Sequence, residues 1–282
     1  MKKLTIILLL MVFLLNSVKV CGQNNDTQAA LYNIGLGGFF GGVGAVINKK
    51  ENEKIGKVFL KGFLQGAGGG YLVYESKKLI YKFSKHEDYS YVWGAKLLNS
   101  AGNSIIQNAA SNRDFWEKWY LNIGFNRVEF TVKEKFKISY KLMPIALYGT
   151  LYSASRGNFD FETSIKTGTF VFSSNNNATI PSANVNSIVL VKGYSSKILA
   201  HELIHVYQYE DFIAINNFTN KLNEKVIVKY PFIRKLSNWI YLDSHALLLK
   251  GMYELESINN KCYFDNFFEN EANYFSDRYK CN

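Results

Sequence analysis

The chain has 282 residues, of which 48% are hydrophobic and 20% charged, and it carries a formal net charge of +10. This length allows one large core or two lobes that share an interface, and the apolar content excludes an intrinsically disordered protein. The lysines are spread along the sequence rather than gathered in one block, so we attribute the charge to solubility or to attraction to anionic envelope surfaces, and we expect no nucleic-acid partner.

The first 22 residues have the pattern of a secretory signal peptide. Two lysines precede an apolar run from Leu4 to Leu15, which is short for a membrane anchor. We predict cleavage between Gly22 and Gln23, so that the charge falls from +10 by three lysines (Lys2, Lys3 and Lys19) to +7. The protein is then exported, to the periplasm, the outer envelope or the exterior.

Lipidation of Cys21 is the alternative to simple cleavage. It is disfavoured because Lys19 and Val20 precede this cysteine, where lipidated cysteines normally follow small residues. The two remaining cysteines, Cys262 and Cys281, are expected to form a disulfide in an oxidising compartment, with two unpaired buried thiols as the alternative.

Glycine dominates the first part of the mature chain. Twelve of the 21 glycines lie between Gly35 and Gly70, and several are spaced four apart. Because glycine is a poor helix former, this spacing predicts helices whose backbones approach each other closely. We expect helices over Ile34 to Ile47, Ile55 to about Phe83 and Tyr91 to Ala110, in a Gly-rich helical lobe spanning residues 23–112.

Membrane association of these helices is the alternative, because small residues four apart are also common between membrane helices. The first helix, at 14 residues, is expected to be too short to span a bilayer, and the second carries Lys57, Lys61 and Gln65. A soluble lobe is therefore favoured, and peripheral association with a membrane or envelope stays open.

From Asn126 the hydrophobic period changes to two. Apolar residues alternate with polar ones from Val128 to Leu142, which predicts a hairpin with one solvated face. Further strands are expected at Phe159 to Ile165, Phe170 to Phe172 and Ser187 to Val191. We therefore predict an α+β fold in which a small, mostly antiparallel sheet within residues 113–282 precedes the functional helix, and in which the last strand could pair with an extended peptide.

The most informative motif is His201-Glu202-Leu203-Ile204-His205. Ser195 or Ser196 is expected to cap a buried helix that contains it. Two histidines four apart lie one turn above the other on the same side of a helix, so both imidazoles can bind one Zn²⁺ ion. Glu202 lies one step around the helix, where a carboxylate can act as general base on water. Two histidines that satisfy neighbouring polar groups in a core are the alternative.

A catalytic zinc site needs a third protein ligand. On a helix, Glu271 has Phe267, Phe268, Tyr274 and Phe275 as neighbours three and four residues away, whereas the neighbours of Glu269 are mostly polar. Glu271 is therefore expected to point into the core and to bind the metal, together with His201 and His205. The alternatives are His245, Glu254, Glu256 and Glu269.

The string from His201 to Gln208, followed by Phe268-Glu269-Asn270-Glu271-Ala272-Asn273, resembles the gluzincin branch of zinc metallopeptidases. In that branch a glutamate on a later helix is the third ligand, often within Glu-Ala-Asp or Asn-Glu-x-x-x-Asp. Here Asn273 and Phe275 stand where the acidic residue of the two forms would fall, so the usual carboxylate support of a zinc-bound histidine has no counterpart. The resemblance covers about residues 187–281 and implies a reaction type rather than a substrate.

The resemblance implies hydrolysis of peptide bonds by zinc-activated water, with Glu202 as general base. The donor that stabilises the oxyanion is expected to be His245, Tyr253, Tyr274 or Arg278, and His245 is included among the catalytic candidates. The alternative comes from another class, an exported, envelope-associated binding or structural protein whose metal is not catalytic.

Overall fold

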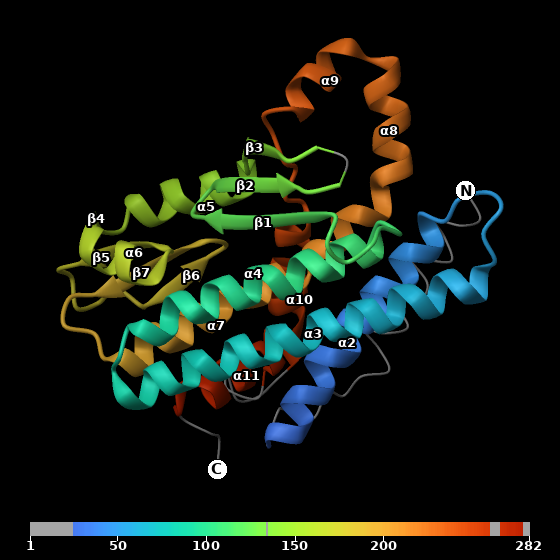
Figure 1. Ribbon diagram of the computed structural model, residues 1–282. Helices are drawn as coiled ribbons and strands as arrows, with labels where there is room; N and C mark the ends of the chain where they lie inside the picture. Colours follow the sequence, from blue (N-terminus) through green and yellow to red (C-terminus); the bar gives the residue numbers. More distant parts are fainter. Residues whose placement is uncertain (1–24, 134, 260–265, 279–282) are drawn as a thin grey trace.

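The structure is a computed structural model that describes residues 25–133, 135–259 and 266–278 (Figure 1). The predicted signal peptide, the lipidation alternative at Cys21, and Cys262 and Cys281 lie outside the described residues, so these expectations stay predictions. The α+β class is confirmed, because long helices surround a three-stranded antiparallel sheet and a four-stranded mixed sheet.

The first three helices of the described residues form a layer along one side of the molecule (Figure 1). They are α2 (Asp26–Ile47), α3 (Ile55–His86) and α4 (Ser90–Ala110). Helix α2 begins eight residues before the predicted start because the Asn25 side chain accepts a hydrogen bond from the Gln28 N–H at 2.9 Å and caps it. At 22 residues α2 is long and apolar enough to cross a membrane, so the length argument against a membrane span was wrong.

Glycines bring α2 and α3 together, as the fourfold spacing predicts. Gly37 and Gly66 face each other, and a Cβ atom added to Gly37 would lie 2.5 Å from the Gly66 carbonyl oxygen. Other glycines of the same helices face open space, among them Gly35 and Gly68. The close approach is therefore confined to one face of each helix, and it buries the middle of α2 against its neighbours.

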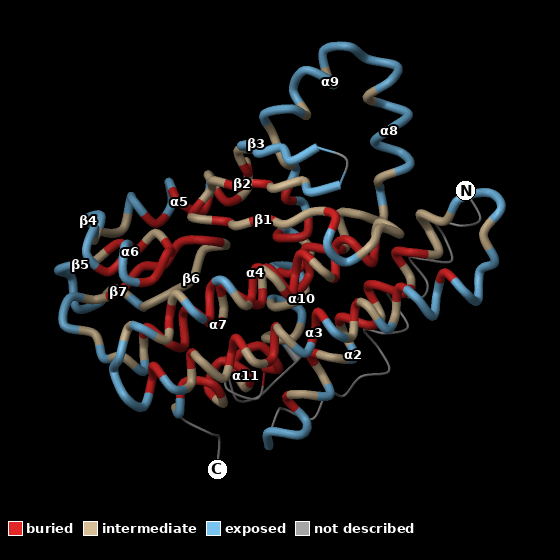
Figure 2. Tube along the Cα trace, viewed as in Figure 1, coloured by how far each residue is buried: buried red, intermediate tan, exposed pale blue. Residues whose placement is uncertain are grey.

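The antiparallel sheet consists of β1 (Lys118–Ile123), β2 (Asn126–Thr131) and β3 (Lys137–Leu142). The predicted hairpin with one solvated face is confirmed in β2 and β3, but the buried face carries the charged residues. Arg127 and Glu129 on β2 are buried, at 2% exposure each, whereas Ile138 and Tyr140 on β3 are 58% and 44% exposed. Strand β3 is more exposed than β1 and β2 (Figure 2). On the charged side, Arg127 bonds Gln107 of α4 at 3.2 Å.

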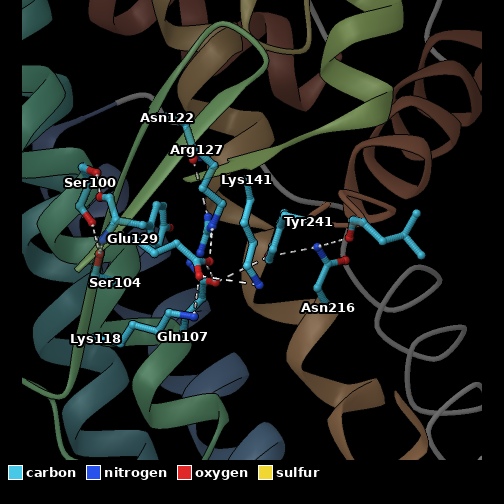
Figure 3. Close-up of polar contacts among 12 residues, drawn as sticks. Ser100, Ser104, Gln107, Lys118, Asn122, Arg127, Glu129, Lys141, Asn216 and Tyr241 are labelled. Atoms are coloured by element: carbon cyan, nitrogen blue, oxygen red, sulfur yellow. Dashed lines mark hydrogen bonds and ion pairs between the residues drawn. The ribbon is translucent and has the colours of Figure 1, made fainter. Parts of the chain in front are cut away.

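The charged side is buried because its polar groups have partners (Figure 3). The Arg127 Nε donates to Glu129 Oε1 at 2.7 Å, and its guanidinium lies between the rings of Tyr120 and Tyr241, 3.8 and 4.0 Å from their centroids. Lys118 forms a 2.8 Å ion pair with Glu129. The facing side of α4 is also polar, and Ser104 accepts a hydrogen bond from the Tyr120 N–H at 3.1 Å. Paired charges can be buried without a large cost.

Helix α5 (Pro144–Ala154) leads to the mixed sheet, which has the order β4-β5-β7-β6. Its strands are β4 (Asn158–Phe159), β5 (Phe170–Ser174), β6 (Ser182–Asn184) and β7 (Ser187–Val191), with β5 and β7 parallel. The segment predicted as a strand up to Ile165 instead forms α6 (Phe161–Thr167), because Asp160 caps it and Gly168 ends it with a φ of 63°. The last strand, β7, is internal, and the edge strands of this sheet are β4 and β6.

The remaining helices carry the metal motif and complete the core. They are α7 (Ser196–Asp211), the 3-10 helix η1 (Ile213–Thr219), α8 (Asn220–Lys229), α9 (Pro231–Ser237), α10 (His245–Asn259) and α11 (Phe267–Ser276). Helices α2 to α4 share hydrophobic clusters with this part of the chain: Tyr74 and Phe83 pack with Leu203 and Phe275, and Phe40 packs with Phe268. The predicted Gly-rich lobe therefore contributes directly to the packing around the site.

Candidate metal centre

Helix α7 holds the two histidines where the sequence predicts them. Its N-cap is Ser195, whose side chain accepts a hydrogen bond from the Ile198 N–H. Leu199, Leu203 and Ile204 are fully buried in the cluster that includes the strands β5 and β7. Because the helix is fixed by this packing, the imidazoles of His201 and His205 are held on its other side, with Nε2 atoms 3.1 Å apart.

The third group at this point is Glu269, from the first turn of α11. Its Oε2 lies 3.2 Å from the His201 Nε2, and its Oε1 lies 3.3 Å from the His205 Nε2. One donor atom from each of the three residues can therefore meet at one ion. Asn266 caps α11 by accepting from the Phe268 N–H, so Glu269 is also close to the positive end of the helix dipole.

The prediction that Glu271 is the third ligand was wrong. Glu271 is fully buried, as expected, but its Oε1 accepts from the Lys77 Nζ at 2.8 Å and its Oε2 from the Gln208 Nε2 at 2.9 Å. Lys77, on α3, also bonds Asp211 at 2.7 Å. A cation from the glycine-rich helices, rather than a metal, is the partner that this buried carboxylate needs.

Burial alone could not separate the two glutamates from the sequence, because both are buried: Glu269 is only 2% exposed. The neighbours of Glu269 are mostly polar because it faces a cleft rather than the apolar core. The partner that explains the burial of Glu271 is Lys77, which lies 194 residues away. No pattern in the sequence pairs these two residues.

Gln208 fixes the orientation of His205. Its Nε2 donates to Glu271 Oε2 and to the Phe268 carbonyl oxygen, both at 2.9 Å, so its Oε1 must face the other way. That oxygen lies 2.8 Å from the His205 Nδ1, which must therefore carry the hydrogen. When the ring binds a metal as neutral imidazole, its lone pair is then on Nε2, the nitrogen that faces His201 and Glu269.

The electrostatics of the three groups indicate a shared cation site. Burial lowers the pKa of His201 to about 4 despite the nearby Glu269. Burial also acts against the charged form of His205, but the hydrogen bond to Glu269 raises its pKa to about 9. Glu269 has its pKa held well below the ordinary range, because the bonds from both imidazoles outweigh its burial. One positive charge, held among three ligand atoms, stabilises this cluster.

Glu202 lies on the same helix and also faces the cleft, with a buried carboxyl group. Burial, with a smaller contribution from the negative charge of Glu269, raises its pKa to about 7, against the opposing effects of His205 and Arg278. A carboxylate with a pKa near neutrality can both accept and return a proton. It is not one of the three groups that could hold the ion.

His245 does not take part in the site. It is the first residue of α10, its Nδ1 lies 3.0 Å from the Asn216 amide nitrogen, and it does not line the cleft. Burial lowers its pKa to about 3, so it is a neutral, hydrogen-bonded core histidine. The expectation of a catalytic His245 was therefore wrong. The sequence held no sign of its partner Asn216, which lies 29 residues earlier in η1.

Of the other predicted oxyanion donors, Tyr253 lies at the site. Its hydroxyl donates to Glu269 Oε1 at 2.6 Å, and its ring is 6.3 Å from that of His205. Tyr274 instead contacts Asp26 at 3.5 Å. Burial is the largest effect on both His201 and Glu202, and it lowers the pKa of the first and raises that of the second. The positive charge of Arg278 lowers both pKa values, so this residue lies near the site as well.

These groups form the floor of a cleft of about 470 Å³. Other residues that line it come from the edge strand β6, from Tyr148 and Tyr152 of α5, and from Leu247 and Tyr253 of α10. The remaining alternatives for the third ligand, Glu254 and Glu256, do not line it. A volume of this size is usual for ligand pockets in proteins, and the edge strand β6 is among the elements that line it.

The donor set fits zinc. In a tetrahedral site with bonds of about 2.05 Å, neighbouring ligand atoms are roughly 3.3 Å apart. The two Nε2 atoms are 3.1 Å apart, and they lie 3.2 and 3.3 Å from different oxygens of Glu269, so both imidazoles and one carboxylate oxygen can reach a single ion. Two imidazoles and one carboxylate are also a ligand set found in catalytic zinc sites that keep one position for water or substrate.

Comparisons with known proteins found no matching family model, no similar curated protein and no similar solved structure.

Proposed function

We propose that this protein is an exported, zinc-dependent peptidase, with the metal held by His201, His205 and Glu269. The observation that carries the proposal is the convergence of these three donors on the floor of an open cleft, beside a buried carboxyl group with a pKa near 7. A structural zinc site has no need of that carboxyl group or of an open cleft. The corrected ligand retains the resemblance to gluzincins, in which a later helix supplies a glutamate.

Bound zinc would supply a Lewis acid that polarises the substrate carbonyl and makes water a nucleophile near neutral pH. Glu202 takes the proton of the attacking water and returns it to the amine nitrogen as the carbon–nitrogen bond breaks. The Tyr253 hydroxyl is the donor that we assign to the negative oxygen of the substrate. Gln208 keeps the His205 ring in the required orientation.

An extended peptide is the substrate that the cleft favours. The edge strand β6 lines the cleft, and an extended chain can add to the edge of a sheet as a further strand. The tyrosines of α5 that line the same cleft provide apolar surface for side chains.

The test is the substitution Glu202→Gln in the full chain, assayed with a mixture of fluorogenic peptides and with zinc analysis of the same sample. Loss of general-base catalysis should lower hydrolysis about 10²- to 10⁴-fold while zinc content stays unchanged. Glu254→Gln, an exposed change on α10, is the control and should retain activity. Equal hydrolysis by the Glu202→Gln protein would contradict the proposal and would favour a non-catalytic metal.

A further inference from the structure

A helical arm formed by residues 220–239 projects from the body of the protein (Figures 1 and 2). It contains α8, α9 and the turn that ends at Trp239. Neither of its two helices has a buried residue. Helices in a globular protein are normally stabilised by burying one apolar face against the core. The two helices of the arm lack this packing.

The arm is nevertheless rich in apolar side chains, and they are exposed. Phe232 is 73% exposed and Trp239 is 68% exposed, and Val228 reaches 81%. Leu222 and Val226 on α8, and Phe232 and Leu236 on α9, are each spaced four apart, so each pair lies on one side of its helix. Exposed apolar side chains gathered on one short segment are typical of an interaction site.

The charge of the arm identifies the kind of partner. Residues 220–239 contain five cations and one carboxylate, Glu224, so the net charge is +4 (five minus one). The cations are Lys221, Lys225, Lys229, Arg234 and Lys235. Apolar and aromatic side chains interleaved with lysine and arginine are typical of helices that lie in the interface of an anionic bilayer.

The neighbouring edge of the antiparallel sheet has the same character. The segment after the arm is joined to the end of β3 by the hydrogen bonds of Leu142 with Trp239 and Tyr241. On β3 and its preceding turn, Phe136 and Ile138 are 68% and 58% exposed, beside the exposed Lys135 and Lys137. This second basic, apolar strip extends the surface at the root of the arm.

We propose that this arm, with the exposed face of β3 at its root, is a docking surface for an anionic phospholipid membrane. The apolar side chains enter the interface, and the lysines and arginines contact lipid phosphates. None of residues 220–239 lines the catalytic cleft, so attachment and hydrolysis are separable. The inference is independent of the proposed peptidase activity.

Co-sedimentation of the full chain with vesicles tests the proposal. The vesicles contain phosphatidylcholine alone or phosphatidylcholine mixed with phosphatidylglycerol, at low and at high salt. We expect binding to the mixed vesicles only, weakened by salt. Phe232→Ser combined with Trp239→Ser, and separately Lys225→Glu combined with Lys229→Glu, should each lower the bound fraction about tenfold or more.

The matched control lies on α3, where Leu64 is 62% exposed and Lys57 is also exposed. Leu64→Ser combined with Lys57→Glu makes one apolar-to-polar change and one charge reversal outside the arm and should leave binding unaltered. All these side chains are exposed, so thermal melting should not change. Failure of the natural chain to bind mixed vesicles, equal binding by the arm variants, or release by the α3 variant would each overturn the proposal. Binding to a protein partner in place of vesicles would do so too.

Discussion

At the scale of single residues, the site depends on a chain of contacts that starts in the glycine-rich helices. Lys77 of α3 bonds Glu271, Glu271 bonds Gln208, and Gln208 bonds the His205 ring. All but the ring itself are nearly inaccessible to solvent. An ion pair in the core therefore determines which nitrogen of His205 faces the metal.

The substitution Gln208→Met removes the acceptor of the His205 Nδ1 hydrogen and leaves the side chain similar in size. We expect the zinc dissociation constant to rise about 10- to 100-fold, because the ring loses its fixed orientation. Chelator competition measures this constant. Lys250→Met, on the exposed wall of the cleft, is the control. An unchanged affinity in the Gln208→Met protein would show that Gln208 does not position His205.

The sequence was sufficient to identify the local part of the site and not the rest. His201, Glu202 and His205 follow from spacing on one helix, and their helix has the predicted cap at Ser195. The choice between Glu269 and Glu271 depends on which elements face α11. That depends on a contact between α3 and α11, which no local pattern encodes. His245 failed for the same reason, since its partner Asn216 lies on another element.

At the scale of elements, the glycine spacing predicts the packing of α2 on α3. It does so because close approach of two helices leaves no room for side chains at positions that recur every four residues along each helix. Gly66→Ala would place a Cβ atom against the Gly37 carbonyl oxygen. We expect this change to lower the free energy of unfolding by roughly 1–3 kcal/mol, the usual cost of overpacking. Urea unfolding measures it.

Gly68→Ala is the matched control, two residues further along the same helix. A Cβ atom there meets nothing within 4 Å. Alanine is the better helix former, so this variant should be as stable as the natural chain or more stable, by up to about 1 kcal/mol. Equal effects of the two substitutions would mean that the helices do not approach as described.

The β-hairpin shows the limit of periodicity. The alternation from Val128 to Leu142 correctly predicts a strand pair with one solvated face, yet it does not reveal that the apolar side is the solvated one. The period of two shows that the two faces of a strand differ in polarity. Which face is buried depends on the surface against which the sheet packs. Here that surface is α4, whose buried side carries Ser100, Ser104 and Gln107. Charged residues on β2 complete this polar layer.

At the scale of the whole molecule, the buried charges make stability dependent on pH. Burial opposes the charged form of Glu129, but Arg127, Lys118 and Lys141 outweigh it and lower the pKa to about 2, from an ordinary value of 4.5. A carboxyl group whose pKa is lower in the folded than in the unfolded chain stabilises the fold at any pH above its unfolded-state pKa. This contribution is lost as the pH falls towards 2. The effect is on the order of 3 kcal/mol.

We therefore expect Glu129→Gln to be less stable than the natural chain at pH 7, and the difference to shrink as the pH falls from about 4.5 towards 2. Denaturant unfolding across this range measures it. Glu162→Gln, an exposed carboxylate paired with Lys166, is the control and should change little at any pH. A difference that stays constant with pH would show that the Glu129 charge does not stabilise the fold.

The claim on which the site depends is that Glu269, rather than Glu271, completes the metal ligands. Zinc content of the purified full chain, measured side by side for Glu269→Gln and Glu271→Gln, tests it most directly. We predict that the Glu269→Gln protein is folded and nearly free of zinc, while the Glu271→Gln protein retains about one zinc per chain. Zinc retained by the Glu269→Gln protein and lost from the Glu271→Gln protein would contradict the account.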